Sequence, residues 1–141
     1  PELIRGTDPA AIIKTAIYDR RPVKTWGKGC CTLLGDAAHP TTPNMGQGAA
    51  MAIEDAIVLA RCLSSYPDPV AAFRVYERLR SARTARVTNL SRYFGVMGQW
   101  KNPGAAWLRN KLIQLGSGKA ATNGYLNFVS YDPHAISLNA G

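Results

Sequence analysis

One stretch, residues 34–55, constrains the fold of this chain more than any other part of it. A short apolar run at residues 31–34 favours a β-strand, which ends at Gly35-Asp36. A loop rich in glycine and proline follows, and a mostly apolar helix is predicted over residues 48–63. A buried strand that leads through a turn into a helix is typical of an α/β fold.

The same stretch carries groups that could hold a ligand. Asp36, at the end of the predicted strand, can accept hydrogen bonds from ligand hydroxyls. Glycines let a backbone approach a ligand closely, and the first N–H groups of a helix favour negative charge. Five alanines in this stretch leave room for a flat molecule. The residues alone therefore predict a site for a partly anionic, hydroxyl-bearing ligand.

The order of these motifs resembles a known family. Residues 35–39 read Gly-Asp-Ala-Ala-His, Gly46-Gln47-Gly48 follows, and then comes Glu54-Asp55. This series is similar to the second FAD-binding motif of the single-component flavoprotein monooxygenases. That family includes aromatic hydroxylases, such as salicylate hydroxylase, and zeaxanthin epoxidase. The resemblance runs over residues 17–63 and continues more weakly through residues 83–87 and 98–103.

The resemblance implies a role for each site residue. Asp36 would accept from the ribityl hydroxyls of FAD, and the Pro43 backbone would lie beside the reactive edge of the flavin. Main-chain N–H groups would face the pyrimidine edge from Gly46, Gly48, Ala49 and Ala50. Gln47 would either touch the flavin or hold the loop. No residue is assigned a catalytic role, because the cofactor carries the chemistry.

The activity implied by the resemblance is that of an FAD-dependent monooxygenase. It would use NAD(P)H and O₂ to hydroxylate or epoxidise a small organic substrate, with electron-rich aromatic compounds expected first and alkenes second. A non-oxygenating flavoprotein of the same fold stays open as an alternative. The sequence does not distinguish NADH from NADPH.

The family's Gly-x-Gly-x-x-Gly fingerprint for the ADP half of FAD does not occur in the sequence. We therefore expect a C-terminal fragment of an α/β, glutathione-reductase-type FAD-binding fold, mostly α-helical with a short buried strand. Residues 1–65 would be the C-terminal part of the FAD-binding domain, and residues 66–141 a helical segment with an irregular tail. Such a fragment is expected to be inactive alone.

Cap signals mark the remaining elements. Asp68-Pro69 predicts a long helix to about Gly98, and Asn102-Pro103 predicts another that ends near Leu115. A short helix is expected over residues 10–15, and irregular structure after Gly116. Five further side chains are given structural roles. His39 would hold the loop by hydrogen bonding, and Arg20 would bond a backbone carbonyl or a carboxylate such as that of Asp55. The three tryptophans would act as packing residues: Trp26, Trp100 and Trp107.

The net charge of +8 raises the question of an anionic partner. Arginines recur from Arg74 to Arg92 on the predicted long helix, either as a solvated face or as a basic module that binds nucleic acid or an acidic partner. We favour the enzyme, because a nucleic-acid module has no need of the loop at residues 35–48.

The composition bounds the remaining possibilities. No apolar run is long enough to cross a membrane, and no signal peptide opens the chain, so a cytoplasmic location without membrane association is expected. The cysteines and histidines lack the spacing of a metal site, and the three thiols are expected to be reduced and buried.

Overall fold

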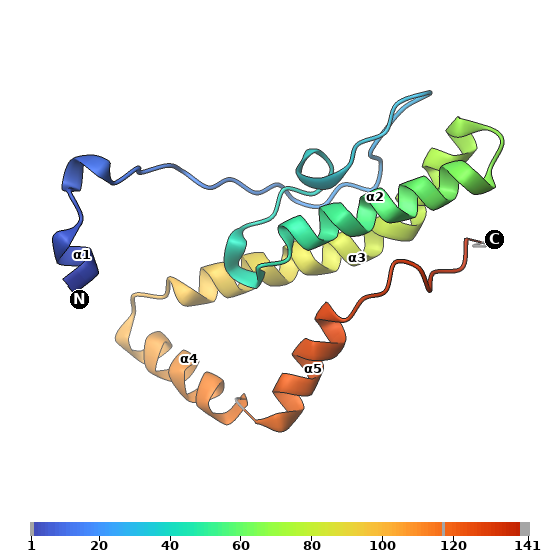
Figure 1. Ribbon diagram of the computed structural model, residues 1–141. Helices are drawn as coiled ribbons and strands as arrows, with labels where there is room; N and C mark the ends of the chain where they lie inside the picture. The colour runs from blue at the N-terminus through green and yellow to red at the C-terminus, as the bar shows by residue number, and fades with distance from the viewer. Residues whose placement is uncertain (1, 117, 139–141) are drawn as a thin grey trace.

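Two long helices form the centre of the computed structural model, which describes residues 2–116 and 118–138. Helix α2 (Gly48–Ser65) and helix α3 (Pro69–Gly98) lie side by side, joined by a short turn (Figure 1). Two shorter helices, α4 (Pro103–Gly116) and α5 (Lys119–Val129), follow them. Before α2, the chain forms α1 (Glu2–Gly6) and three single turns of 3₁₀ helix: η1 (Pro9–Ala11), η2 (Gly35–Ala37) and η3 (Pro43–Met45).

The predicted helices at residues 48–63, 69–98 and 103–115 are confirmed, with ends that differ by at most two residues. Their start signals act as expected. The Asp68 carboxylate accepts from the backbone N–H groups of Val70 (3.1 Å) and Ala71 (3.2 Å) at the start of α3. Asn102 Oδ1 accepts in the same way from Gly104 and Ala105 at the start of α4.

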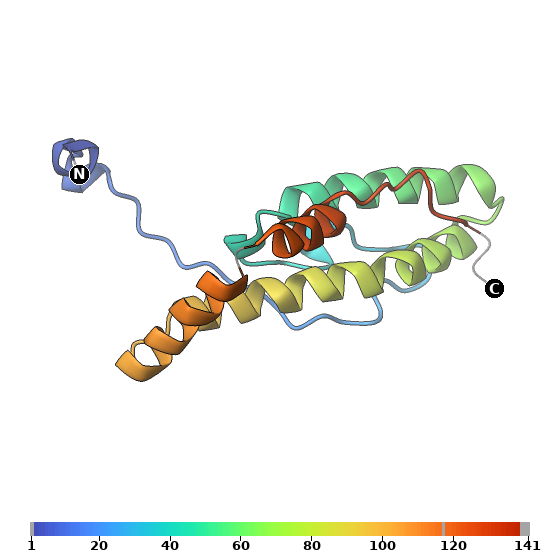
Figure 2. The ribbon, with the colours of Figure 1, turned by 90° about the horizontal axis from the view of Figure 1, so that it is seen from below.

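Two predictions about helices are wrong. In place of a helix over residues 10–15, the chain forms only the 3₁₀ turn η1 at Pro9–Ala11. Residues 119–129 are the helix α5 rather than irregular structure. Gly124 and two asparagines lower the helix propensity of α5, but tertiary contacts override it. Arg83 of α3 donates to the Phe128 carbonyl at 3.3 Å, and its guanidinium lies 5.9 Å from the centre of the Phe128 ring. Helix α5 crosses the α2–α3 pair in the view of Figure 2, and Figure 1 shows that its C-terminal end is the part that comes near α3.

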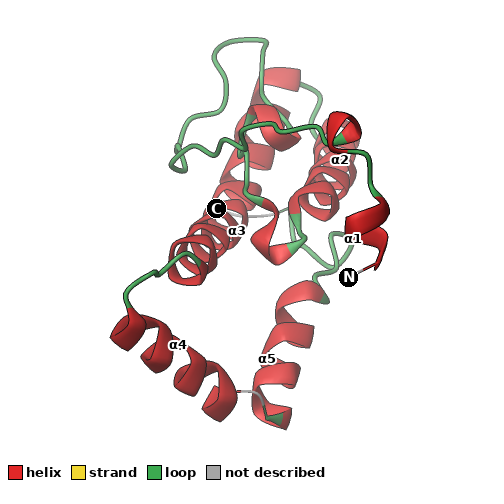
Figure 3. Ribbon diagram, turned by 90° about the vertical axis from the view of Figure 1, so that its left-hand side faces the viewer, coloured by secondary structure: helices red, strands yellow, loops and turns green. Residues whose placement is uncertain are grey.

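The predicted buried strand at residues 31–34 does not form. Figure 3 shows helices and loops but no strand in the part of the chain that the structure describes. Leu34 has extended backbone (φ −140°, ψ 148°), but Cys31 and Leu33 are exposed. A strand needs a neighbouring strand for its backbone hydrogen bonds. Here α3 supplies side chains instead: Tyr76 donates to the Leu33 carbonyl, and the Thr32 hydroxyl donates to Glu77.

The core lies between α2, α3 and the loop that precedes them. Trp26 is 3% exposed and meets the Tyr76 ring edge-on at 5.6 Å, so its predicted packing role is confirmed. The same prediction is wrong for Trp107, which lies on α4 and is 63% exposed. The other buried members of this cluster are Ala38, Val58, Cys62, Ala72 and Val75. Cys62 is buried as expected, whereas Cys30 and Cys31 are exposed, because the segment that holds them is not covered by a sheet.

The C-terminal segment returns to the helix pair. Arg61 of α2 donates to the carbonyls of Pro133 and Ile136, and the Tyr66 hydroxyl donates to the carbonyl of Leu138. The side chains of Ile136 and Leu138 pack against the core cluster. The division of the chain at residue 65 remains a prediction. Helices α2 and α3, on either side of that point, share one core.

Candidate functional site

The first wall of the site is the turn η2, which carries Asp36. Gly35 has a φ of +59°, a conformation that favours glycine, and a Cβ there would lie 3.2 Å from the Cβ of Ala52. This tight approach brings the turn onto helix α2. Asp36 itself is exposed, so its carboxylate is available to a ligand.

The second wall is the loop from η3 into the start of α2. Gly46 has a φ of +62° and ends η3, and the Gln47 carbonyl accepts the first bond of α2 from Met51 N–H at 2.9 Å. The Gln47 side chain makes no cap hydrogen bond to the helix. Among the described residues, no acidic side chain stands in the first turn of α2 either. The backbone N–H groups of that turn are therefore open to a hydrogen-bond acceptor from outside.

These two walls border a cleft of about 570 Å³. Five predicted site residues line it together: Asp36, Pro43, Gly46, Gly48 and Ala49. Gln47 and Ala50 belong to the same loop and helix start but do not line the cleft. The cleft is completed by Leu34, Gly35, Thr41, Thr42 and Ala52.

The two threonines are site residues that sequence reasoning missed. The Thr41 hydroxyl lies 2.7 Å from that of Thr88, and the Thr42 hydroxyl lies 3.0 Å from that of Ser91. Both bonds tie the loop to α3 and set the back of the cleft. Their only signal in the sequence is the pair of polar residues between Pro40 and Pro43.

Two of the three glycines that line the cleft have open space beside them. A Cβ placed on Gly46 or on Gly48 would meet nothing within 4 Å, so open space lies in front of both. Gly27 is the opposite case, because a Cβ there would lie 2.0 Å from the Cys31 carbonyl oxygen. Gly46 and Gly48 therefore leave room for another molecule, whereas Gly27 serves the packing of the chain itself.

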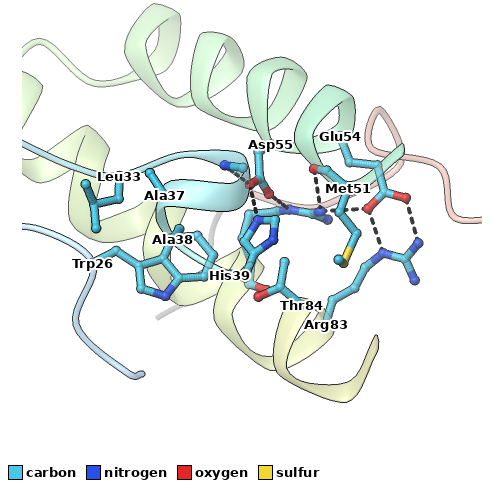
Figure 4. A network of polar contacts seen from close by, with 12 residues as sticks. Trp26, Leu33, Ala37, Ala38, His39, Met51, Glu54, Asp55, Arg83 and Thr84 are labelled. Atoms are coloured by element: carbon cyan, nitrogen blue, oxygen red, sulfur yellow. Dashed lines mark hydrogen bonds and ion pairs between the residues drawn. The ribbon is translucent and has the colours of Figure 1, made fainter. Parts of the chain in front are cut away.

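Behind the cleft lies a buried network of charged side chains (Figure 4). Asp55 is fully buried, and its Oδ2 accepts from Gly35 N–H at 3.1 Å and lies 2.6 Å from His39 Nε2. Its Oδ1 accepts from Arg80 Nε at 2.6 Å. Arg80 also donates to Glu54, which accepts two further bonds from Arg83 at 2.6 and 2.7 Å. Each buried charge thus meets an opposite charge.

Electrostatics keeps Asp55 and Arg80 of this network ionised. Burial by itself would raise the pKa of Asp55, but hydrogen bonds from His39 and Arg80 outweigh it and hold the pKa below its ordinary value. Burial would likewise lower the pKa of Arg80, but Asp55 and Glu54 raise it. An ionised carboxylate only accepts hydrogen bonds, so His39 Nε2 carries the proton in its bond to Asp55.

The structure also shows the hydrogen-bond and ion-pair partners of Arg20, His39 and the arginines of α3. Arg20 donates to the carbonyls of Ala37 and Ala38, so the predicted backbone bond is confirmed. His39 has the predicted structural role, although its partner comes from α2 rather than from its own loop. The predicted solvated arginine face is wrong in part, because four of its arginines pair with carboxylates: Arg74, Arg80, Arg83 and Arg92.

A larger hollow, of about 820 Å³, lies between α3, α5 and η3. Four aromatic side chains line it, together with Met45, Arg86 and Asn89: Tyr93, Phe94, Tyr125 and Phe128. Within residues 2–116 and 118–138, no cluster of three or more histidine, cysteine or acidic residues could hold a metal ion. No described helix is long and apolar enough to cross a membrane.

Known proteins match this chain closely over part of their length. The chain is 48% identical to the aurachin C monooxygenase/isomerase of Stigmatella aurantiaca, over 83% of this chain and 30% of that protein. It is 52% identical to 3-hydroxybenzoate 6-hydroxylase 1 of Aquipseudomonas alcaligenes, over 69% of this chain and 25% of that protein. The chain thus spans a third or less of these relatives.

A solved structure extends the similarity to the fold. HpxO of Klebsiella pneumoniae, crystallised with FAD and uric acid, superposes with a TM-score of 0.81 at 30% identity, over 91% of this chain and 33% of that one. The family described as "FAD binding domain" matches residues 6–91, which is more than half of the chain. The chain therefore belongs to the FAD-binding-domain family.

Proposed function

We propose that this chain forms the flavin-facing part of an FAD-dependent monooxygenase. The observation that carries the proposal is the cleft between Asp36 and the open N-terminus of α2. One wall offers a carboxylate for hydroxyl groups, and the other offers free backbone N–H groups for an anionic ring edge. Family membership and the monooxygenases among the relatives support the same assignment.

Each residue of the cleft would act by holding or orienting the cofactor. Asp36 would accept from the ribityl hydroxyls, and the N–H groups of Gly48, Ala49 and Ala50 would face the pyrimidine edge. Pro43 would border the side on which oxygen and substrate react, while Gly46 and Gln47 would shape the loop. When bound, FAD would supply the exchange of electrons between NAD(P)H and O₂.

A small electron-rich aromatic compound is the substrate that we propose first. The aromatic hollow lies beside η3, whose Met45 lines it while Pro43 of the same turn lines the flavin cleft. Aromatic side chains suit a planar ring, and Arg86 at the rim suits an anionic substituent. Two similar proteins support a planar substrate: one is named a 3-hydroxybenzoate 6-hydroxylase, and HpxO was crystallised with uric acid.

The test uses the whole protein, purified with its flavin and supplied with NAD(P)H and isotope-labelled dioxygen. A monooxygenase transfers one labelled oxygen atom to the organic product. A flavoprotein of the same fold that does not oxygenate would consume the nicotinamide and leave the product unlabelled. Absence of bound FAD from the whole protein would contradict the cofactor assignment itself.

The proposal includes two further predictions, one about the type of fold and one about cellular location. The glutathione-reductase type of the FAD-binding fold would require the strands that pair with residues 31–34 to come from another part of the whole protein. The cytoplasmic location expected from the sequence also remains a prediction.

A further inference from the structure

One buried carboxylate holds the chain on both sides of Asp36, at the first residue of the turn η2 and just after its end. Asp55 accepts from Gly35 N–H, at the first residue of the turn, at 3.1 Å. The same oxygen, Oδ2, lies 2.6 Å from Nε2 of His39, two residues after the turn ends at Ala37. Asp36 lies between these two anchor points, so its position depends on where Asp55 stands.

The orientation of Asp55 is in turn fixed from α3. Its second oxygen, Oδ1, accepts from Arg80 Nε at 2.6 Å, and Arg80 is fully buried. A carboxylate whose two oxygens are both engaged has little freedom to rotate. A chain of contacts therefore runs from α3 through Arg80 and Asp55 to the turn.

We propose that Asp55 is a positioning residue for the cofactor, which sets the Asp36 turn at the cleft through Gly35 and His39. The proposal rests on the proposed function, because it concerns the same FAD site. Asp55 touches no part of the cleft itself; its effect on the ligand passes through the turn. His39 transmits that effect, and Arg80 orients the carboxylate.

The neighbouring Glu54 is the matched control. It is buried on the same helix and accepts from the same Arg80 at 2.6 Å. Its other partner is Arg83, and it has no hydrogen bond to the turn at residues 35–39. Loss of either carboxylate should destabilise the fold, but only loss of Asp55 should release the turn.

The experiment measures FAD affinity by titration of the apo form of the whole protein, and unfolding by urea, for Asp55→Asn and Glu54→Gln. An asparagine has one acceptor oxygen in place of two, so it cannot serve both Arg80 and the turn. We expect Asp55→Asn to weaken FAD binding about tenfold or more, and Glu54→Gln about twofold or less. Equal losses of affinity in the two variants would overturn the proposal.

Two variants of His39 separate positioning from general stability. Glutamine can donate an N–H from Nε2 to Asp55 where histidine does, whereas leucine cannot. His39→Gln should therefore keep most of the FAD affinity, and His39→Leu should lose about as much as Asp55→Asn. Equally weak binding by the two would count against the proposal. If Asp36→Ala leaves FAD affinity unchanged, the proposed cofactor site is wrong. If Asp36→Ala weakens FAD binding but Asp55→Asn does not, only the positioning role of Asp55 is refuted.

Discussion

The two faces of helix α2 differ in where charged side chains stand. The face against α3 buries Glu54 and Asp55 together with Met51, Val58 and Cys62. The face turned away exposes apolar and small side chains at helical spacing: Ala49, Ile53, Ala56, Ala60 and Leu63. The inner face thus mixes charged and apolar side chains, while the outer face carries small and apolar side chains where the usual amphipathic helix is polar.

This difference between the two faces separates the contacts that hold the chain together from the surface that the chain offers to other molecules. Buried charge is tolerated on the inner face because every carboxylate there has an arginine partner. The outer face carries Ile53, 63% exposed, and Leu63, 44% exposed. An apolar stripe of this kind marks a surface that another part of a larger protein would cover.

The largest effect is expected from replacing Arg80 with leucine, because this residue of α3 pairs with both buried carboxylates on the inner face of α2. Arg80→Leu leaves two buried carboxylates without their shared partner, which should lower the free energy of unfolding by about 3–5 kcal/mol. Chemical denaturation of the whole protein measures it. Arg86→Leu, at an exposed arginine of the same helix, should change stability by about 0.5 kcal/mol or less. Similar small losses in both variants would mean that the inner network contributes little.

The second-largest effect on stability is expected from substitutions on the outer face of α2. Lysine at both Ile53 and Leu63 should destabilise the whole protein by about 2–4 kcal/mol, if that face is covered there. In the 141-residue chain by itself, the same pair of changes should cost little and should reduce self-association, which light scattering would detect. An unchanged unfolding free energy in the whole protein would show that the face is open to solvent.

Asp36 belongs to neither face, and its loss should affect the ligand rather than the fold. Asp36→Ala should weaken FAD binding by about 1.5–3 kcal/mol, the range for a hydrogen bond to a charged group. Flavin titration of the apo form measures this loss. Asp68→Ala removes a carboxylate that caps α3, and should cost about 1 kcal/mol of stability without changing FAD affinity. The reverse pattern would remove Asp36 from the site.

A smaller effect is expected at the start of α2. Gly48→Val places a side chain in the open space before the helix N-terminus and keeps an anionic ring edge away from it. The midpoint potential of bound flavin should fall by about 10–20 mV, which corresponds to the modest strength of a helix dipole. Ala56→Val, on the exposed face of the same helix, should leave the potential unchanged. An unchanged or higher potential in Gly48→Val, with FAD fully bound, would contradict the loop geometry.

The smallest effect is expected from lowering the pH, which changes the stability that Asp55 contributes. The pKa of Asp55 lies below its ordinary value of 3.8, so the stability that it contributes is fully present above that value. From about pH 7 to pH 5 this contribution should not change, and below 3.8 it should fall as the folded carboxylate takes up a proton. Urea denaturation from about pH 7 to below pH 3.8 tests the direction of this change in unfolding free energy. A stability contribution from Asp55 that grows on acidification would contradict the prediction.

Local chemistry in the sequence determined the helices and the site loop. Helix α3 begins at Pro69 because Asp68 caps it, and α4 begins at Pro103 because Asn102 does the same. The cleft residues from Asp36 to Ala49 are close in sequence, so a turn and a helix start suffice to bring them together. A prediction from motifs succeeds where the contacts are this local.

Tertiary structure decided the rest, because the deciding partners are far apart in the chain. Residues 31–34 have strand-like composition, but a strand forms only beside another strand, and α3 takes that place here. The arginines of α3 look like a solvated face until Arg80 meets Asp55, 25 residues away. Helix propensity underestimates α5, because Arg83 supports it from α3. Burial and charge pairing are properties of neighbours in space, and periodicity along one helix does not encode them.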